Sequence, residues 1–163
     1  MKRAIPIILI LTMLAGCGAA PEAEPAPAEV PAAPPGLTVE SGGRSVEAER
    51  STYDWNRALE DGMWEGISAD CPHPLDILDQ YPILETEGEQ AVLVFEEEPD
   101  EISQLCFWQE EDFTNSRSPS EVGRVEDGAA VLEEGLCLYE VTAVWERENW
   151  GGTVNYVFQV RRK

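Results

Sequence analysis

The sequence lacks the short motifs that most often identify an enzyme. It contains no Gly-x-Ser-x-Gly nucleophile elbow, no Walker phosphate-binding loop, no dinucleotide-binding fingerprint and no His-Glu-x-x-His zinc motif. Its single histidine is His73. With 32 Asp and Glu residues, some carboxylate pair falls at a glycosidase spacing by chance, so no pair indicates acid–base catalysis. We therefore predict a protein that is not an enzyme and that carries no cofactor.

Basic residues are scarce. Eleven Lys and Arg stand against 32 Asp and Glu, which gives a net charge of −21. A surface of this charge repels phosphate backbones, so we exclude nucleic acid as a partner. The acid-rich stretches 96–101 and 110–112 lack the alternating Asp/Asn and central Gly of a calcium loop, and we interpret them as solvated surface with no metal. Five Trp, four Tyr and four Phe argue against a purely disordered acidic chain.

No hydrophobic run in the sequence is long enough to cross a membrane. The longest, residues 4–14, would span about half of a hydrocarbon core of about 30 Å as a helix. Lys2 and Arg3 precede it and small residues follow it, which is the pattern of a secretory signal peptide. The run ends in Leu14-Ala15-Gly16-Cys17, and these residues resemble a bacterial lipobox.

The lipobox resemblance implies that residues 1–16 are removed and that Cys17 is acylated. Two or more acyl chains, at about 0.8 kcal/mol per buried methylene, hold a protein firmly at the membrane. We therefore expect a lipoprotein at the outer face of the cell membrane. The mature charge would be −23, because 11 minus 2 basic residues remain against 32 acidic ones. The alternative is an ordinary signal peptide cut after Ala20, with Cys17 discarded.

Residues 17–36 predict a disordered linker that follows the lipidated cysteine. Six prolines among Ala and Glu favour extended polyproline II over a core or a helix. Such a segment would act as a stalk of roughly 50 Å. A Pro-rich ligand for a recognition domain is the alternative. The remaining residues, 37–163, are enough for one domain with its own core.

Short strands are predicted throughout residues 37–163. The clearest is 136–146, where Cys137, Tyr139 and Val141 alternate with polar residues. Asp127-Gly128 is typical of a tight hairpin turn. Region 59–82 contains Gly and Pro and is expected to be irregular, with one helical turn at 75–80. The expected strands are 37–39, 44–49, 51–57, 90–96, 101–108, 122–126, 129–132, 136–146 and a last strand ending at Val160. This pattern predicts an all-β fold, an antiparallel immunoglobulin-like β-sandwich.

A set of short stretches stands out within residues 51–160, namely Trp55, 69–76, 106–108, 139–145 and 151–153. Together they resemble an uncharacterised extracytoplasmic domain of Gram-positive bacteria. That domain is found on small lipoproteins and at the outer end of membrane metallopeptidases of the β-lactam-sensor type. The resemblance implies no known activity.

Cys71 and His73 are the residues closest to a chemical motif. Each precedes a proline, so both are expected to be extended, with side chains on one side about 7 Å apart. That distance is too long for an easy thiol–imidazole hydrogen bond. Zinc bound by both residues with Asp70 or Asp76 lacks the usual ligand spacing. We favour a stiff loop that caps the sandwich.

Beyond Cys17, the sequence holds an odd number of cysteines. Outside the membrane one disulfide is permitted, either Cys71–Cys106 or Cys106–Cys137. Cys106 and Cys137 lie on predicted strands, so the alternative is that they are small core residues.

Trp64 and Trp150 lie in Gly-flanked loops. Large aromatic residues in such loops are candidate anchors for a partner or a sugar ring. The alternative is that both pack over the ends of the sandwich.

These observations favour a non-catalytic, membrane-anchored binding or interaction module of the cell envelope. Surfaces around Trp64, His73 and Trp150 would meet a protein, peptide or glycan, and a cationic partner would suit the charge. The alternative is a metal-dependent hydrolase or other enzyme that uses scattered carboxylates and His73. A solute-binding lipoprotein is a weaker third option, because one small sandwich lacks two closing lobes. A cleft lined by His73 and carboxylates would favour the enzyme.

Overall fold

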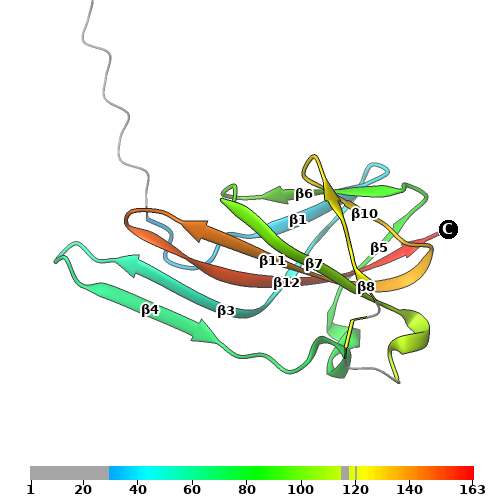
Figure 1. Cartoon of the computed structure of the whole chain (residues 1–163), viewed down its shortest axis with the longest axis horizontal. Helices are drawn as coiled ribbons and strands as arrows, with labels where there is room; N and C mark the ends of the chain where they lie inside the picture. The colour runs from blue at the N-terminus through cyan, green and yellow to red at the C-terminus, as the bar shows by residue number, and fades with distance from the viewer. Residues whose placement is uncertain (1–29, 115–117, 120) are drawn as a thin grey trace, which may run out of the picture.

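A computed structural model describes residues 30–114, 118–119 and 121–163 (Figure 1). Cys17, the predicted signal peptide and residues 17–29 of the predicted linker lie outside this part. The described residues form two packed β-sheets, so the predicted all-β sandwich is confirmed. Within these ranges, no helix has the length and apolar character needed to cross a membrane.

Two sheets make the sandwich. Sheet A has the order β2 (Arg44–Glu47), β1 (Leu37–Ser41), β6 (Gln90–Phe95), β10 (Ala129–Val131) and β9 (Val125–Glu126). Sheet B has the order β4 (Trp64–Ala69), β3 (Glu49–Ala58), β12 (Trp150–Arg162), β11 (Gly135–Glu146), β7 (Glu101–Gln109) and β8 (Glu121–Val122). All these pairs are antiparallel, and β5 (Ile83–Thr86) runs parallel to the end of β12.

The strand order is immunoglobulin-like, as predicted. In sheet A, β1, β6, β10 and β9 are neighbours in the order of the first, second, fifth and fourth strands of an immunoglobulin domain. In sheet B, β7, β11 and β12 take the places of the third, sixth and seventh strands. Strands β2 to β5 are an insertion between the first and second strands of that pattern.

The core lies between the sheets and is built by alternation along β11 and β12. Side chains at every second position of these strands are almost fully buried. Trp55 from β3 meets Trp145 edge to face, with ring centroids 5.7 Å apart. The backbone N–H of Glu133 donates to the Tyr139 hydroxyl at 2.8 Å, a contact like the tyrosine corner of immunoglobulin folds. The alternating residues of β11 and β12 that are buried in this core are Cys137, Tyr139, Val141, Ala143, Trp145, Val154, Tyr156, Phe158 and Val160.

Region 59–82 is more ordered than predicted. It contains the whole of β4, which pairs with β3 from Ala58 opposite Trp64 to Tyr53 opposite Ala69. The expected helical turn at 75–80 is two 3-10 turns, η1 (Pro74–Asp76) and η2 (Leu78–Gln80). A third turn, η3 (Glu110–Asp112), follows β7. Strand β4 was missed because its order depends on pairing with β3 and not on a local hydrophobic pattern.

The ordered domain begins before residue 37, which corrects the predicted boundary. Pro34 and Pro35 are buried, and Val30 packs against the main core. The Tyr156 hydroxyl donates to the Pro35 carbonyl at 2.7 Å, and Trp55 Nε1 donates to the Pro31 carbonyl at 3.4 Å. Extended proline-rich backbone leaves its carbonyls unpaired, so they are available to these two core side chains.

Candidate functional site

The three candidate partner-binding residues do not form one site. Trp64 opens β4 at the β3–β4 turn and is 58% exposed. Strand β4 then leads away from this turn, so Trp64 and the segment that holds His73 lie at opposite ends of β4 (Figure 1). Trp150 begins β12 and is only 7% exposed.

Trp150 is a packing residue, so its prediction as a partner-binding residue is wrong. Its ring lies 5.3 Å from the ring of Trp55, measured between centroids. The Arg147 guanidinium covers it at 5.5 Å from the ring centroid. The Gly-flanked hairpin turn folds Trp150 back over the end of the core. For Trp150, the alternative of packing over the end of the sandwich is therefore the correct one.

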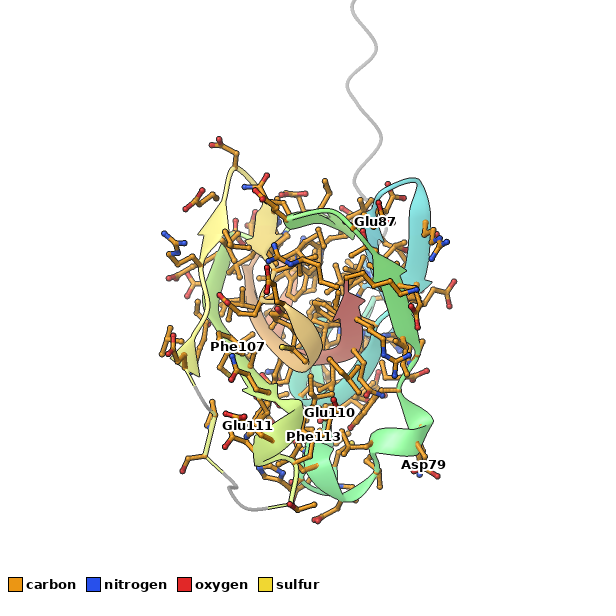
Figure 2. All side chains as sticks on the ribbon, turned by 90° about the vertical axis from the view of Figure 1, so that its right-hand side faces the viewer. Asp79, Glu87, Phe107, Glu110, Glu111 and Phe113 are labelled. Atoms are coloured by element: carbon orange, nitrogen blue, oxygen red, sulfur yellow. The ribbon has the colours of Figure 1, made fainter. Side chains whose placement is uncertain are left out.

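The segment around His73 covers one part of the outer face of sheet B. It contributes Tyr81, with Leu75, Ile77 and Leu78 partly buried, to a second apolar cluster. The Gln159 side-chain amide holds this segment by donating to the carbonyls of Leu78 and Tyr81 at 2.8 and 3.1 Å. Seen from the end, η2 and η3 both lie in the lower part of the molecule, with Asp79 at its outer edge (Figure 2). The favoured interpretation of a capping loop is correct, although the loop caps a sheet face. The sheet residues of this cluster are Cys106, Trp108, Leu138 and Val157.

His73 has structural contacts within this loop. Its Nδ1 accepts from the Leu75 N–H at 3.3 Å and so caps η1. Its ring meets Trp108 edge to face, with centroids 5.6 Å apart. Among the described residues, no group of three or more His, Cys, Asp or Glu side chains is arranged to hold a metal ion. A hollow of about 240 Å³ lies instead between Gly42 and Lys163, and its lining does not include His73.

Glu140 is a half-buried carboxyl group near His73. It lies on the outer face of β11, opposite Cys106 in the register. Burial raises the pKa of Glu140, and the nearby His73 partly offsets this shift. Burial, Cys71 and Glu140 together raise the pKa of the Tyr81 hydroxyl to about 12. The covered part of the face therefore disfavours negative charge.

We predict that Glu140→Gln stabilises the protein at neutral pH. Because the folded-state pKa is raised, the stabilising effect of protonated Glu140 is present below the unfolded pKa of about 4.3 and is lost as pH rises through the folded value. The gain from Glu140→Gln should therefore be largest near pH 7 and close to zero at about pH 4. Urea unfolding between pH 4 and 8 measures it.

The control is Glu47→Gln on β2, because Glu47 is exposed and its loss removes the same charge from the acidic surface. A pH dependence that is the same in both variants would contradict the prediction.

Neither of the two alternative disulfides is formed. Cys71, Cys106 and Cys137 are all free. Cys106 belongs to the outer cluster and Cys137 to the core between the sheets, so sheet B separates the two sulfurs. Burial raises the pKa of Cys106 to about 12 and that of Cys137 to about 11. Both cysteines are small buried residues, which was the alternative to a disulfide.

The uncovered part of the outer face of sheet B, which we call the open face, was not predicted as a site. Outward positions alternate along each strand, so residues from five strands share this surface. Two contacts confirm that these positions of β3 and β4 share one face. Ser68 donates to Asp54 at 2.5 Å, and a Cβ at Gly66 would lie 3.0 Å from Asn56 Oδ1. The open face comprises Trp64, Gly66, Ser68, Asp54, Asn56, Gly151, Thr153, Asn155, Thr142, Val144, Glu146, Gln104 and Glu101.

The charged residues that the register places on the open face are all acidic. Asp54 shares the face with Glu101, opposite Val144, and with Glu146, opposite Gly151. Glu65 and Arg57 alternate to the other face, where they form an ion pair at 2.7 Å. At one end stands Trp64, which is the only exposed one of the five tryptophans, all of which lie in the described ranges. A polar surface with acidic and hydrogen-bonding side chains and one exposed indole is therefore the best-defined candidate site.

The chain matches no protein-family model, no curated protein and no solved structure.

Proposed function

We propose that this protein is a non-catalytic binding module of the cell envelope, held at the outer face of the bacterial cell membrane by acyl groups on Cys17. The signal-peptide pattern and the Leu14-Ala15-Gly16-Cys17 lipobox support the anchor. The observation that carries the binding role is the open face, with Trp64 exposed on a polar strand surface. Exposed aromatic residues on an ordered framework are typical binding anchors.

The position of the described N-terminal end fits this proposal. Val30 lines a shallow hollow with Arg57, Leu59 and Asn149, at the end of the sandwich that carries the β3–β4 turn (Figure 1). Residues 18–29 separate Cys17 from Val30, a reach of roughly 40 Å if extended. The open face would then meet ligands in the layer next to the membrane.

The described surface supports binding better than catalysis. His73 caps η1 and packs on Trp108, so its ring helps to shape the covering loop. The open face is flat and built from strands, whereas small-molecule active sites are usually concave. The hydrolase alternative from the sequence therefore has no supporting geometry around His73.

The anchor is tested by metabolic palmitate labelling of the wild type and Cys17→Ala. We expect label and membrane fractionation in the wild type only. Equal labelling of both would remove the anchor from the proposal.

Binding is tested by sedimenting the Cys17→Ser chain with washed cell envelopes. We expect Trp64→Ala to lower the retained fraction about tenfold, because truncation of an aromatic anchor commonly costs more than 1 kcal/mol. Val122→Ser is the matched control, since Val122 is also exposed but lies on β8 at the opposite edge of sheet B. Equal retention of all three chains would contradict the binding role of the open face.

A further inference from the structure

We propose that the protein forms a two-fold dimer in which β4 pairs antiparallel with β4 of a second copy, with Gly66 at the centre. Strand β4 is an edge of sheet B, because no strand among the described residues pairs with it on the side away from β3. Three features of β4 support this dimer: the direction of its unpaired backbone groups, the size of its side chains and its charge. The dimer depends neither on the ligand of the open face nor on the anchor at Cys17.

The backbone of β4 points a regular set of hydrogen-bonding groups at the free edge. In an antiparallel pair, residues directly opposite each other alternate between hydrogen-bonded and non-hydrogen-bonded. The Leu59 N–H donates to the Met63 carbonyl at 2.7 Å, and this hydrogen-bonded pair directly continues the register of β3 and β4. Counted from there, Trp64, Gly66 and Ser68 fall in non-hydrogen-bonded pairs with β3. Their N–H and C=O groups therefore point away from β3, toward the free edge.

A second β4 satisfies all of these groups when the Gly66 residues of the two copies lie opposite each other. Trp64 then lies opposite Ser68 of the second copy, and each of these pairs exchanges two hydrogen bonds. The two copies are related by a two-fold axis through the Gly66 pair, the commonest symmetry of homodimers. Sheet B then continues across both copies, and their open faces lie on the same side.

The side chains of β4 suit this pairing. The Trp64 indole is 58% exposed and stands on the same face as Gly66 and Ser68. In the dimer it lies beside Ser68 and diagonal to Gly66 of the second copy, within reach of an aromatic side chain. Because these two residues are small, the indole has room to lie across the second copy. On the opposite face Ile67 and Ala69 are only partly buried, and the second copy covers them further.

Strand β4 is also the edge at which two acidic chains meet with least repulsion. Its one charged residue, Glu65, is paired with Arg57 at 2.7 Å. The other edge strands of the two described sheets each present an exposed carboxylate, which opposes pairing. These carboxylates are Glu47 on β2, Glu121 on β8 and Glu126 on β9.

The acidic residues of the two open faces stay apart in this dimer. Asp54 lies on β3, one strand from the edge, so three strand spacings, about 14 Å, separate the two copies of it. This separation exceeds the screening length of about 8 Å at physiological ionic strength. Glu101 and Glu146 lie on β7 and β11, still farther from β4.

A second copy fits the edge better than a free peptide does. Its β4 is already extended and paired with β3, so little conformational entropy is lost on association, whereas a free peptide must be ordered. It also supplies a small residue at each position that Trp64 covers. A cationic peptide would be drawn to the carboxylates of the open face, which lie away from the backbone groups of β4.

Association is tested with the full-length Cys17→Ser chain, kept in detergent because residues 4–14 are apolar. We expect sedimentation equilibrium to show monomers and dimers in a ratio that depends on protein concentration. Ser68→Pro should weaken dimerisation at least tenfold, because it removes an N–H that points to the free edge, where a strand tolerates proline. Ser68→Ala is the matched control, since it keeps that N–H, and it should dimerise as the parent chain does.

Hydrogen exchange of the parent chain gives a second readout, which does not depend on how a variant folds. The amides of Trp64, Gly66 and Ser68 should exchange at least fivefold more slowly when most chains are dimeric. The amides of Glu65 and Ile67 already bond to β3, so their exchange should change little with protein concentration.

The register is tested by cross-linking in a Cys17→Ser, Cys71→Ser background, in which the remaining cysteines are buried. Trp64→Cys and Ser68→Cys chains are mixed and oxidised. Residues opposite each other in a hydrogen-bonded pair have Cα atoms about 5.5 Å apart, within disulfide range. Two copies of position 64 lie four residues apart along the strands, at least about 13 Å. The mixture should therefore give at least five times more covalent dimer than either chain alone.

Four results would overturn the inference. They are a chain that stays monomeric into the millimolar range, dimerisation that Ser68→Pro and Ser68→Ala affect equally, and cross-linking that is the same in the mixture as in each chain alone. The fourth is protection of the β4 amides by cell envelopes without dimers, which would assign this edge to another partner. The proposed binding role is judged separately, by Trp64-dependent retention of the monomeric Ser68→Pro chain on cell envelopes.

Discussion

A chain that begins at Leu37 unfolds at a clearly lower urea concentration than a chain that begins at Val30. Removal of residues 30–36 exposes the surface under Pro34 and Pro35, which are buried against the sandwich. It also removes the carbonyls that accept from Tyr156 and Trp55. Each hydrogen bond contributes about 1 kcal/mol, and each buried apolar side chain about 1.5–3 kcal/mol. The conformational entropy that residues 30–36 lose on folding reduces this stabilisation. The loss is smaller for proline, because its φ is already fixed.

The expected net loss is on the order of 2–4 kcal/mol in the free energy of unfolding. Fluorescence-monitored urea unfolding of the two chains measures it, because Trp55 and Trp145 report on this end of the core. Tyr156→Phe in the longer chain is the control, since it removes one hydrogen bond and should cost about 1 kcal/mol. Equal unfolding midpoints for the two chains would show that residues 30–36 contribute no stability.

Residues 30–36 show why composition alone placed the domain boundary too late. Proline-rich sequence predicts extended backbone, and the backbone here carries no strand or helix. Whether such a segment lies free or against a domain depends on the surface beside it. Here that surface is the end of the core, where Trp55 and Tyr156 need acceptors for their polar groups. Neither need is visible in the linker sequence.

Strands β11 and β12 were predictable because their two faces differ sharply. Inward residues such as Val141 and Phe158 are buried, while outward residues such as Thr142 and Thr153 are polar. Strand β4 has the opposite character, with Trp64 outward and Glu65 inward. It tolerates Glu65 because Arg57 from β3 pairs with it. A strand at the sheet edge, stabilised by its partner, gives no periodic signal.

The two Gly-flanked tryptophans also differ because of the surface beside them. Trp150 and Trp64 look alike in sequence, yet only Trp64 is exposed. The β11–β12 turn brings Trp150 back onto Trp55, whereas the β3–β4 turn lies at the edge of sheet B. The open face could not be predicted from the sequence either, because its residues come from strands that are far apart along the chain.

Gly152→Ala should cost far more stability than an alanine substitution at most other glycines. A Cβ at Gly152 would lie 2.0 Å from the Asp54 carbonyl oxygen and 3.0 Å from the Trp55 Cα. These are backbone atoms of the paired strand β3, which cannot rotate away as a side chain can. The substitution therefore pushes β3 from β12. We expect a loss of more than about 3 kcal/mol, in the range of severe single substitutions.

Gly128→Ala is the matched control for this prediction. Gly128 has a positive φ of 76° but no atom within 4 Å of an added Cβ, so its cost is backbone strain alone, about 1–2 kcal/mol. Urea unfolding midpoints compare the two, and near-ultraviolet circular dichroism follows the Trp55–Trp150 contact. Similar losses in both variants would show that β3 relaxes freely away from Gly152. In that case the close pairing of β3 and β12 would not hold Asp54 and Asn56 in their positions on the open face.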